Sequence, residues 1–228
     1  MALTTSARRQ LGIRNEVAAL KRARTVAAAV ELFYQNGYQN TTLDAIAERL
    51  GVTKPFIYVH FSSKTELLAE ICSRGIASSI EAIDSVLPLP VPAREKLRLL
   101  GERFVTAVLG SQMHIAIFSR EEKNLLTADL KRIDDMRRAF DRKLTALLRG
   151  GIETGEFNVP DARLTALAIG GLVSWAYVWY RPAGRLSLNQ ISVEISRLIL
   201  RMVTVDTTSA ASSLIGRRRA RAKAGSDQ

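Results

Sequence analysis

Cysteine and histidine are scarce in this sequence, and their scarcity excludes several kinds of site. Its 228 residues include one cysteine, Cys72, and two histidines, His60 and His114. A lone cysteine cannot form a disulfide within the chain, and we expect it to be a buried thiol rather than a redox sensor. The two histidines lie far apart with no cluster of cysteines beside them, so the sequence predicts no metal site.

The chain also lacks the short motifs of common enzyme families. It contains no G-x-S-x-G, no C-x-x-C and no Walker-type phosphate loop. Scattered carboxylates do occur, but we interpret Glu121 and Glu122 as a charge pair at a helix N-terminus, where acidic residues complement the helix dipole. We therefore predict no catalytic residues and no resident cofactor, and expect that the protein is not an enzyme.

Long hydrophobic runs are absent as well. The longest uncharged run covers residues 164–180, between Arg163 and Arg181. It falls short of the roughly 20 residues that a membrane span needs, so we expect a buried helix of a soluble protein. The N-terminus carries no apolar segment typical of a secretory signal. These features predict a cytoplasmic protein that does not bind membrane.

Acidic residues are outnumbered, with 22 Asp and Glu against 33 Lys and Arg, for a net charge of +11. The excess lies mainly at the two ends. Residues 1–24 hold six basic residues and one acidic residue, and residues 216–228 hold five and one. Such basic segments indicate acidic partners such as nucleic acid. The last cluster, GRRRARAK, is interpreted as a solvated tail, with DNA or an anionic membrane as alternative partners.

Residues 42–68 have the pattern of two short helices joined by a tight turn. Apolar residues recur between Leu43 and Leu50 at the i, i+3, i+4, i+7 spacing of one buried helix face. Gly51 follows the last of them, where a left-handed backbone conformation favours glycine. This arrangement is typical of a helix-turn-helix that binds DNA.

Side chains that can cap a helix stand where each of these helices should begin. Thr42 and Thr53 precede the two short helices, and Pro55 is tolerated because it falls in a first turn. Ser63 and Glu66 form an S-x-x-E capping box that should start a further helix.

This stretch closely resembles the N-terminal DNA-binding domain of the TetR family of bacterial transcriptional repressors. The resemblance is ungapped, and with the preceding helix it spans residues from about 20 to 82. The chain departs from the family pattern at Thr53, where serine is usual, and at Pro55–Phe56, where small residues are common. The matching positions are Thr42, Ile46, Ala47, Gly51, Val52, Thr53, Tyr58, His60, Phe61, Lys64 and Leu67.

The resemblance also implies which residues contact DNA. Family residues that match Thr42, Thr53, Tyr58, His60 and Lys64 contact phosphates, which fixes register without reading sequence. The alternative for Tyr58 and His60 is ordinary packing between helices.

A recognition helix at residues 54–60 would bury Ile57 with Phe61 and present its other residues to the duplex. Lys54 could then pair with guanine, and Phe56 could pack on a thymine methyl group or support the turn. The side chains expected to face DNA or its backbone are Lys54, Pro55, Phe56, Tyr58 and His60.

Helical periodicity continues along the rest of the chain, and no segment is a convincing strand. We predict an all-α protein, with an N-terminal helix-turn-helix three-helix domain and a helical C-terminal domain for ligand binding and dimerisation. The prolines of PLPVP at 88–92 mark the boundary between them. The expected organisation is a flexible basic arm at 1–19, a DNA-binding domain at 20–87, a ligand-binding and dimerisation domain at 93–205 and a disordered basic tail at 206–228.

The second half contains the segment W-x-Y-x-W-Y-R-P-A-G-R-L-S at residues 175–187. This segment resembles the KstR-like subgroup of steroid- and fatty-acid-catabolism regulators, which implies a small apolar effector such as an acyl-CoA thioester. Aromatic and histidine side chains of this half could line its cavity, although an aromatic stripe is more often core. The candidate ligand-binding residues are Phe104, His114, Phe118, Trp175 and Trp179.

The apolar faces of the last two expected helices are larger than one core needs, so we expect a homodimer on a palindromic DNA operator. The resulting hypothesis is a repressor that a ligand releases from DNA. One alternative is a TetR-type regulator of drug efflux, and activation rather than repression stays open. Another is an architectural protein that binds nucleic acid without sequence specificity through its basic tails.

Overall fold

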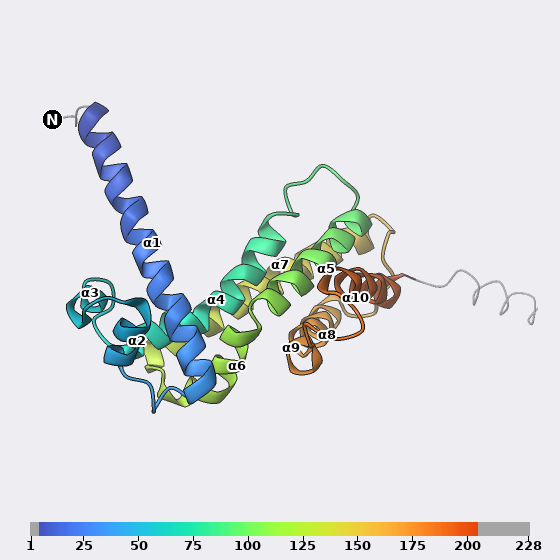
Figure 1. Ribbon diagram of the computed structural model, residues 1–228. Helices are drawn as coiled ribbons and strands as arrows, with labels where there is room; N and C mark the ends of the chain where they lie inside the picture. The colour runs from blue at the N-terminus through green and yellow to red at the C-terminus, as the bar shows by residue number, and fades with distance from the viewer. Residues whose placement is uncertain (1–4, 205–228) are drawn as a thin grey trace, which may run out of the picture.

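The computed structural model describes residues 5–204, with side chains from residue 12 onward, and every regular element in that range is helical. The predicted all-α class is confirmed. Figure 1 shows α1 to α3 at one end of the molecule and α5, α7, α8 and α10 at the other, with α4 running between them. The elements are α1 (Thr5–Asn36), α2 (Leu43–Leu50), α3 (Lys54–Tyr58), α4 (Lys64–Asp84), α5 (Ala93–Gly110), α6 (Gln112–Glu121), a 3-10 turn (Glu122–Asn124), α7 (Thr127–Glu153), α8 (Ala162–Ser174), α9 (Ala176–Trp179) and α10 (Leu188–Val203).

Helix α1 begins well before residue 20, where the DNA-binding domain was expected to start. It starts at Thr5 and spans 32 residues, so the prediction of a flexible arm at 1–19 is wrong for residues 5–19. This stretch holds no proline, and its three alanines and three arginines favour helix without tertiary packing. The N-terminal half of α1 projects beyond α2 and α3 (Figure 1). The expected tail at 206–228 lies outside the described residues.

The turn between α2 and α3 forms as its sequence predicts. The Thr42 hydroxyl accepts a hydrogen bond from the Ala45 N–H at 3.1 Å, and Gly51 adopts a left-handed φ of 66°. Thr53 has the extended backbone of an N-cap, but its side chain makes no capping hydrogen bond. Helix α3 ends at Tyr58, earlier than the expected residue 60.

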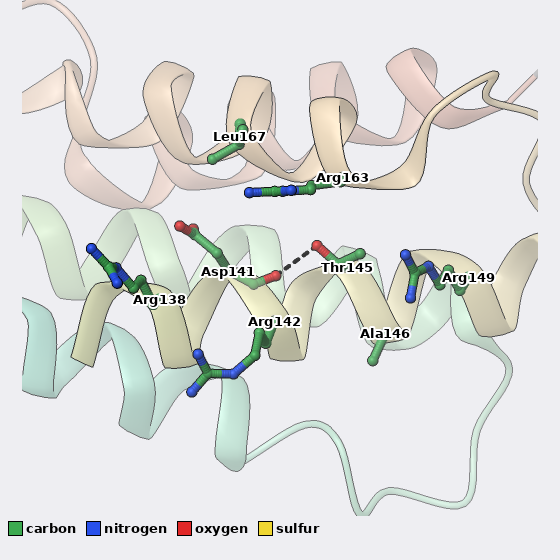
Figure 2. Close-up of a pocket in the computed structure, with 8 residues that line it drawn as sticks. All are labelled: Arg138, Asp141, Arg142, Thr145, Ala146, Arg149, Arg163 and Leu167. Carbon is green, nitrogen blue, oxygen red and sulfur yellow. Dashed lines mark hydrogen bonds between the residues drawn. The ribbon is translucent and has the colours of Figure 1, made fainter. Parts of the chain in front are cut away.

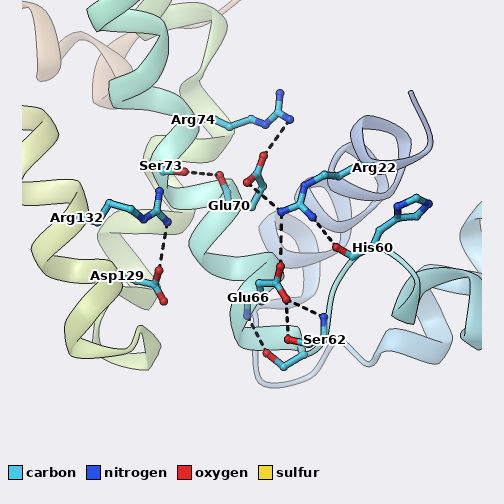
Figure 3. Close-up of polar contacts among 10 residues, drawn as sticks. Arg22, His60, Ser62, Glu66, Glu70, Ser73, Arg74, Asp129 and Arg132 are labelled. Carbon is cyan, nitrogen blue, oxygen red and sulfur yellow. Dashed lines mark hydrogen bonds and ion pairs between the residues drawn. The ribbon is translucent and has the colours of Figure 1, made fainter. Parts of the chain in front are cut away.

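The capping box of α4 is displaced by one residue. Ser63 accepts from the Glu66 N–H at 3.0 Å, as expected. The Glu66 carboxylate, however, accepts from the N–H and the hydroxyl of Ser62, at 2.8 and 2.7 Å, rather than from Ser63 (Figure 3). Because Arg22 also lies beside this carboxylate, Glu66 caps the helix and at the same time joins it to α1.

Helix α4 contributes to both hydrophobic clusters of the molecule. Leu67 and Ile71 are buried in the first cluster, with α1, α2 and α3, whereas Ile83 is buried in the second, with α5, α7, α8 and α10. Ile76 packs against both. The packing therefore changes from one cluster to the other within α4, ahead of the prolines at 88–92, so a displacement of α4 acts on both clusters.

The helix expected to begin at Glu121 and Glu122 does not begin there. Glu121 ends α6, and α7 begins at Thr127, so the interpretation of Glu121 and Glu122 as a helix N-terminal pair is wrong. The chain is extended at Leu125, whose side chain is buried in the first cluster. Burial of this side chain overrides the local preference for helix.

Helix α8 packs on the second cluster through a narrow stripe. Ala162, Ala166, Ile169 and Val173 are buried at i, i+4, i+7, i+11, and Asp161 caps the helix by accepting from the N–H groups of the next turn. The other face is exposed in the single subunit, so the prediction of a buried helix is wrong for most of this run. Among the described residues, one segment, 162–179, has the length and composition of a membrane span.

Candidate DNA-binding surface and effector cavities

Helix α3 is anchored on one side and exposed on the other. Ile57 and Phe61 are almost completely buried, as predicted, whereas Tyr58 is 49% exposed. Lys54 and Pro55 are also exposed, and Phe56 and His60 are half-buried. The structure therefore brings five of the predicted DNA-facing residues onto one surface, with Thr42 and Thr53 exposed at the starts of α2 and α3.

Lys54 forms an ion pair across the turn. Its Nζ lies 2.7 Å from Oδ2 of Asp44, in the first turn of α2, and this contact raises the pKa of Lys54. Both side chains are exposed, so the pair is weak in water and a DNA group can compete for the ammonium. The contact holds the Lys54 side chain close to the α2–α3 junction.

Phe56 and His60 pack edge to face, with ring centroids 5.6 Å apart. Phe56 also packs against the first cluster, and Lys21 Nζ lies 5.5 Å from its ring centroid. Phe56 thus supports the turn and still exposes part of its ring to solvent. The expected support of the turn agrees with this position, and contact of Phe56 with a base stays a prediction.

Arg22 supports the recognition turn, and the sequence interpretation missed this role. Its guanidinium lies 3.3 Å from Glu70 Oε2 and 4.0 Å above the Phe61 ring, and it donates to the carbonyl oxygen of His60 (Figure 3). In the sequence, Arg22 is one of six basic residues among the first 24, a pattern that indicates charge but no structural partner. Glu66 and Glu70 are one helical turn apart on α4. This pair of carboxylates is the sequence signal that could have indicated a cationic structural partner such as Arg22.

Lys64 was expected to contact phosphate, yet its ammonium already has three acceptors. Nζ donates to the carbonyl oxygens of Tyr38, Gln39 and Thr41, at 2.9, 3.4 and 3.0 Å. These carbonyls belong to the loop that precedes α2. Lys64 therefore fixes α2 against the first turn of α4 and positions the DNA-facing surface.

The five candidate ligand residues do not meet around one cavity. Phe104 is buried with its ring centroid 4.6 Å from that of Phe140. Trp175 and Trp179 are 63% and 48% exposed. His114 is half-buried, and burial, together with Arg74, lowers its pKa.

Phe118 lines a small cavity among α4, α5, α6, α7 and α8. Its volume is about 110 Å³, below the range of about 300–1,000 Å³ that is usual for ligand pockets. Gly75 and Ser79 of α4, Arg137 of α7 and Ser174 of α8 complete much of the wall. Any larger group that enters this cavity must displace α4 or a neighbouring helix.

A larger groove of about 550 Å³ lies between α7 and α8. Figure 2 shows the Asp141 side chain directed towards α8, with Arg163 and Leu167 above it. Burial raises the pKa of the Asp141 carboxyl, although Arg137 and Arg163 oppose this shift. No cluster of three metal-ligating side chains occurs among residues that the structure describes. The groove residues are Arg138, Asp141, Arg142, Thr145, Ala146, Arg149, Arg163 and Leu167.

Comparison with known proteins gives matches in both halves of the chain. The sequence model described as "Bacterial regulatory proteins, tetR family" matches residues 26–71. The model described as "Tetracyclin repressor-like, C-terminal domain" matches residues 90–203.

Three relatives have names that agree with the KstR-like resemblance of the second half. The HTH-type transcriptional activator FasR of Mycolicibacterium smegmatis is 36% identical over 84 residues, which cover 37% of this chain and only 38% of FasR. The fatty acid metabolism regulator protein of Bacillus subtilis is 27% identical, over 64% of this chain and 76% of that protein. The HTH-type transcriptional repressor KstR2 of M. smegmatis is 26% identical, over 82% of this chain and 92% of that protein.

Solved structures share the fold over most of the described chain. The TetR-family regulator PfmR from Thermus thermophilus superposes with a TM-score of 0.71 at 28% identity, covering 78% of this chain and 97% of PfmR. AibR, solved in complex with isovaleryl coenzyme A and operator DNA, superposes with a TM-score of 0.67 at 24% identity, with the same coverage. On the strength of its two matched regions and this shared fold, the chain belongs to the TetR family of bacterial transcriptional regulators, which are regulators rather than enzymes and bind operator DNA as homodimers.

Proposed function

We propose that this protein is a homodimeric cytoplasmic repressor that binds a palindromic operator and is released by an acyl-CoA thioester. The observation that carries the DNA-binding part is the exposed surface of α3, held rigidly from behind. Ile57 and Phe61 fix the helix to the first cluster, while Arg22 and Lys64 join the turn and the α2 loop to α1 and α4. Such preorganisation lets α3 enter the major groove with little further loss of conformational entropy.

Within this proposal, Thr42, Thr53, Tyr58 and His60 contact the phosphate backbone, and Lys54, Pro55 and Phe56 lie against base edges. Lys64 acts differently from its expected role, because its ammonium is bound to three carbonyl oxygens. The basic N-terminal half of α1 adds charge beside the duplex, which increases affinity in a salt-dependent way.

Dimerisation rests on the exposed apolar face of the last helices. An exposed apolar stripe of this length is unusual for a monomer and typical of an interface. Two α3 helices related by a two-fold axis would then lie about 34 Å apart, or a multiple of that distance. The exposed residues are Leu164, Leu167, Leu172, Trp175, Val178, Trp179, Leu198 and Met202.

Regulation follows from the position of the small cavity. Gly75, Ile76 and Ser79 of α4 line it, and α4 also carries the first cluster on which α3 rests. An acyl group larger than the cavity binds only when α4 moves, so it binds the DNA-incompetent arrangement more tightly and shifts the population towards it.

The test begins with genomic fragments selected by the protein, followed by fluorescence anisotropy on the selected duplex. Decanoyl-CoA should release the duplex, whereas decanoate and free coenzyme A should have much weaker effects. If no acyl-CoA weakens binding while a panel of aromatic cationic drugs does, the efflux type of regulator replaces this proposal. Equal binding to random duplex would instead favour the architectural protein.

A further inference from the structure

The groove between α7 and α8 contains four guanidinium groups that form no direct salt bridge with a described residue. Among the residues that the structure describes, Arg138, Arg142, Arg149 and Arg163 have no carboxylate oxygen within 4 Å. Their neighbours on α7 differ, because Arg132 pairs with Asp129 at 3.2 Å and Arg137 lies 3.8 Å from Asp134. The groove thus carries an excess of positive charge, which the nearby carboxylates of Asp135, Asp141 and Asp161 offset only in part.

The spacing of these arginines suits an extended anion. Arg138, Arg142 and Arg149 lie at i, i+4 and i+11 on one face of α7, which corresponds to about 16 Å along the helix. Arg163 extends from α8 over Asp141, whereas the Arg142 side chain is directed away from α8 (Figure 2). Guanidinium groups bind phosphate oxygens through paired N–H donors and keep their charge at any physiological pH. Among the described residues that line the groove, Asp141 is the one carboxylate against four arginines. The net charge of the groove lining is therefore positive.

The groove and the small cavity lie along the same pair of helices. Arg137 of α7 lines the cavity and Arg138 lines the groove. On α8, Leu167 lines the groove and Ser174 lines the cavity, two helical turns apart, or about 10 Å. A ligand with an anionic head and an apolar tail can therefore reach from one to the other along the α7–α8 contact.

We propose that the arginine groove binds the phosphate groups of a nucleotide-linked thioester, whose acyl tail follows the α7–α8 contact into the cavity beside α4. This assignment rests on the proposed acyl-CoA response and adds the site of its nucleotide end. Ala146 supplies apolar surface within the groove, and Leu167, which also belongs to the proposed dimer face, borders it. The volume of about 550 Å³ lies within the usual range for small-molecule pockets.

The test compares two double variants of the full-length chain by titration calorimetry. R142Q/R149Q removes two groove guanidinium groups, and R94Q/R132Q removes the same charge from exposed positions outside the groove. The probes are decanoyl-CoA, decanoyl-pantetheine, which lacks the nucleotide, and adenosine 3′,5′-bisphosphate, which lacks the tail. We expect R142Q/R149Q to lower the affinity for decanoyl-CoA and for the bisphosphate at least tenfold. Its affinity for decanoyl-pantetheine should fall less than twofold. R94Q/R132Q should bind all three like the wild type.

Several results overturn the assignment. If the wild type fails to bind the bisphosphate, or R142Q/R149Q binds decanoyl-CoA normally, the groove does not hold the phosphates, even if decanoyl-CoA still releases the operator. If R142Q/R149Q instead loses its dimeric mass in light scattering, the arginines contact a second copy of the chain. Conversely, loss of bisphosphate binding in R142Q/R149Q, with an operator that no acyl-CoA releases, supports the phosphate site and contradicts the proposed effector response.

Discussion

Lys64 Nζ lies 2.9 Å from the carbonyl oxygen of Tyr38 and 4.3 Å from the centroid of the Tyr38 ring. One ammonium group therefore makes a charge-assisted hydrogen bond and a cation–π contact with the same residue. Tyr38 in turn hydrogen-bonds through its hydroxyl to Thr65 at 3.1 Å. The loop before α2 is thus joined to the first turn of α4 at two points, and this junction fixes the orientation of the α2–α3 unit.

Replacing Lys64 by methionine should destabilise the first cluster and weaken operator binding together. The partly buried carbonyl of Thr41 loses its donor, and that of Tyr38 keeps only the Thr41 N–H at 3.3 Å, which costs about 1–3 kcal/mol. Urea unfolding followed by circular dichroism measures this loss. Lys131→Met is the matched control, because Lys131 is exposed and pairs only with Asp135 on its own helix. A K64M chain as stable as the K131M chain contradicts a structural role for Lys64.

Glu66 should make stability depend on pH. Hydrogen bonds from the Ser62 hydroxyl and N–H, followed by the charge of Arg22, lower the pKa of Glu66 below 4.5. Because the folded-state pKa is the lower one, this stabilisation is complete above the unfolded-state pKa and is lost as the pH falls through the folded-state pKa. The free energy of unfolding should therefore fall more steeply for the wild type than for Glu66→Gln between about pH 5 and pH 3. Identical slopes for the two chains would show that the carboxylate is not linked to folding.

Replacing each of two glycines by alanine should change the stability of the fold in opposite directions. A Cβ on Gly101 of α5 would lie 2.9 Å from the Cα of Ser196 on α10, whereas a Cβ on Gly150 of α7 meets nothing within 4 Å. Gly101→Ala should destabilise the chain by about 1–3 kcal/mol because the two backbones must separate. Gly150→Ala should stabilise it by about 0.5–1 kcal/mol. Thermal unfolding of both variants provides the comparison, and a neutral G101A would mean that α5 and α10 are not so closely packed.

The exposed faces of α9 and α10 should be interface in solution. Trp175→Glu combined with Leu198→Glu places two charges on this surface and should reduce the mass in light scattering from two chains to one. Leu126→Glu serves as control, since Leu126 is 62% exposed at the start of α7, away from these helices. A wild type that is already monomeric at micromolar concentration would remove the basis for a palindromic operator.

The short helices around the turn were predictable because their signals are local. The Thr42 cap, the left-handed Gly51 and the buried Ile57 each follow from neighbouring residues. Long-range partners were not predictable. Nothing near Lys64 in sequence indicates that its ammonium binds carbonyls 23 to 26 positions away.

The predicted helix bounds were wrong where helix propensity and tertiary packing favour different structures. The early start of α1 follows from composition alone, without apolar periodicity, so no buried-face pattern predicts it. The break at Leu125 depends on burial against distant residues. The aromatic residues predicted as ligand contacts separate into core, in Phe104, and exposed surface, in Trp175, because composition does not reveal which side of a helix packs against the core.

The central claim is that α3 presents its exposed face to a specific duplex. The most direct measurement is fluorescence anisotropy of a selected operator and a scrambled duplex, for the wild type and for a Lys54→Ala, Tyr58→Ala double variant of unchanged stability and mass. We predict that the wild type prefers the operator by about a thousandfold or more and that the variant loses most of this preference. A variant that keeps full operator occupancy contradicts the account.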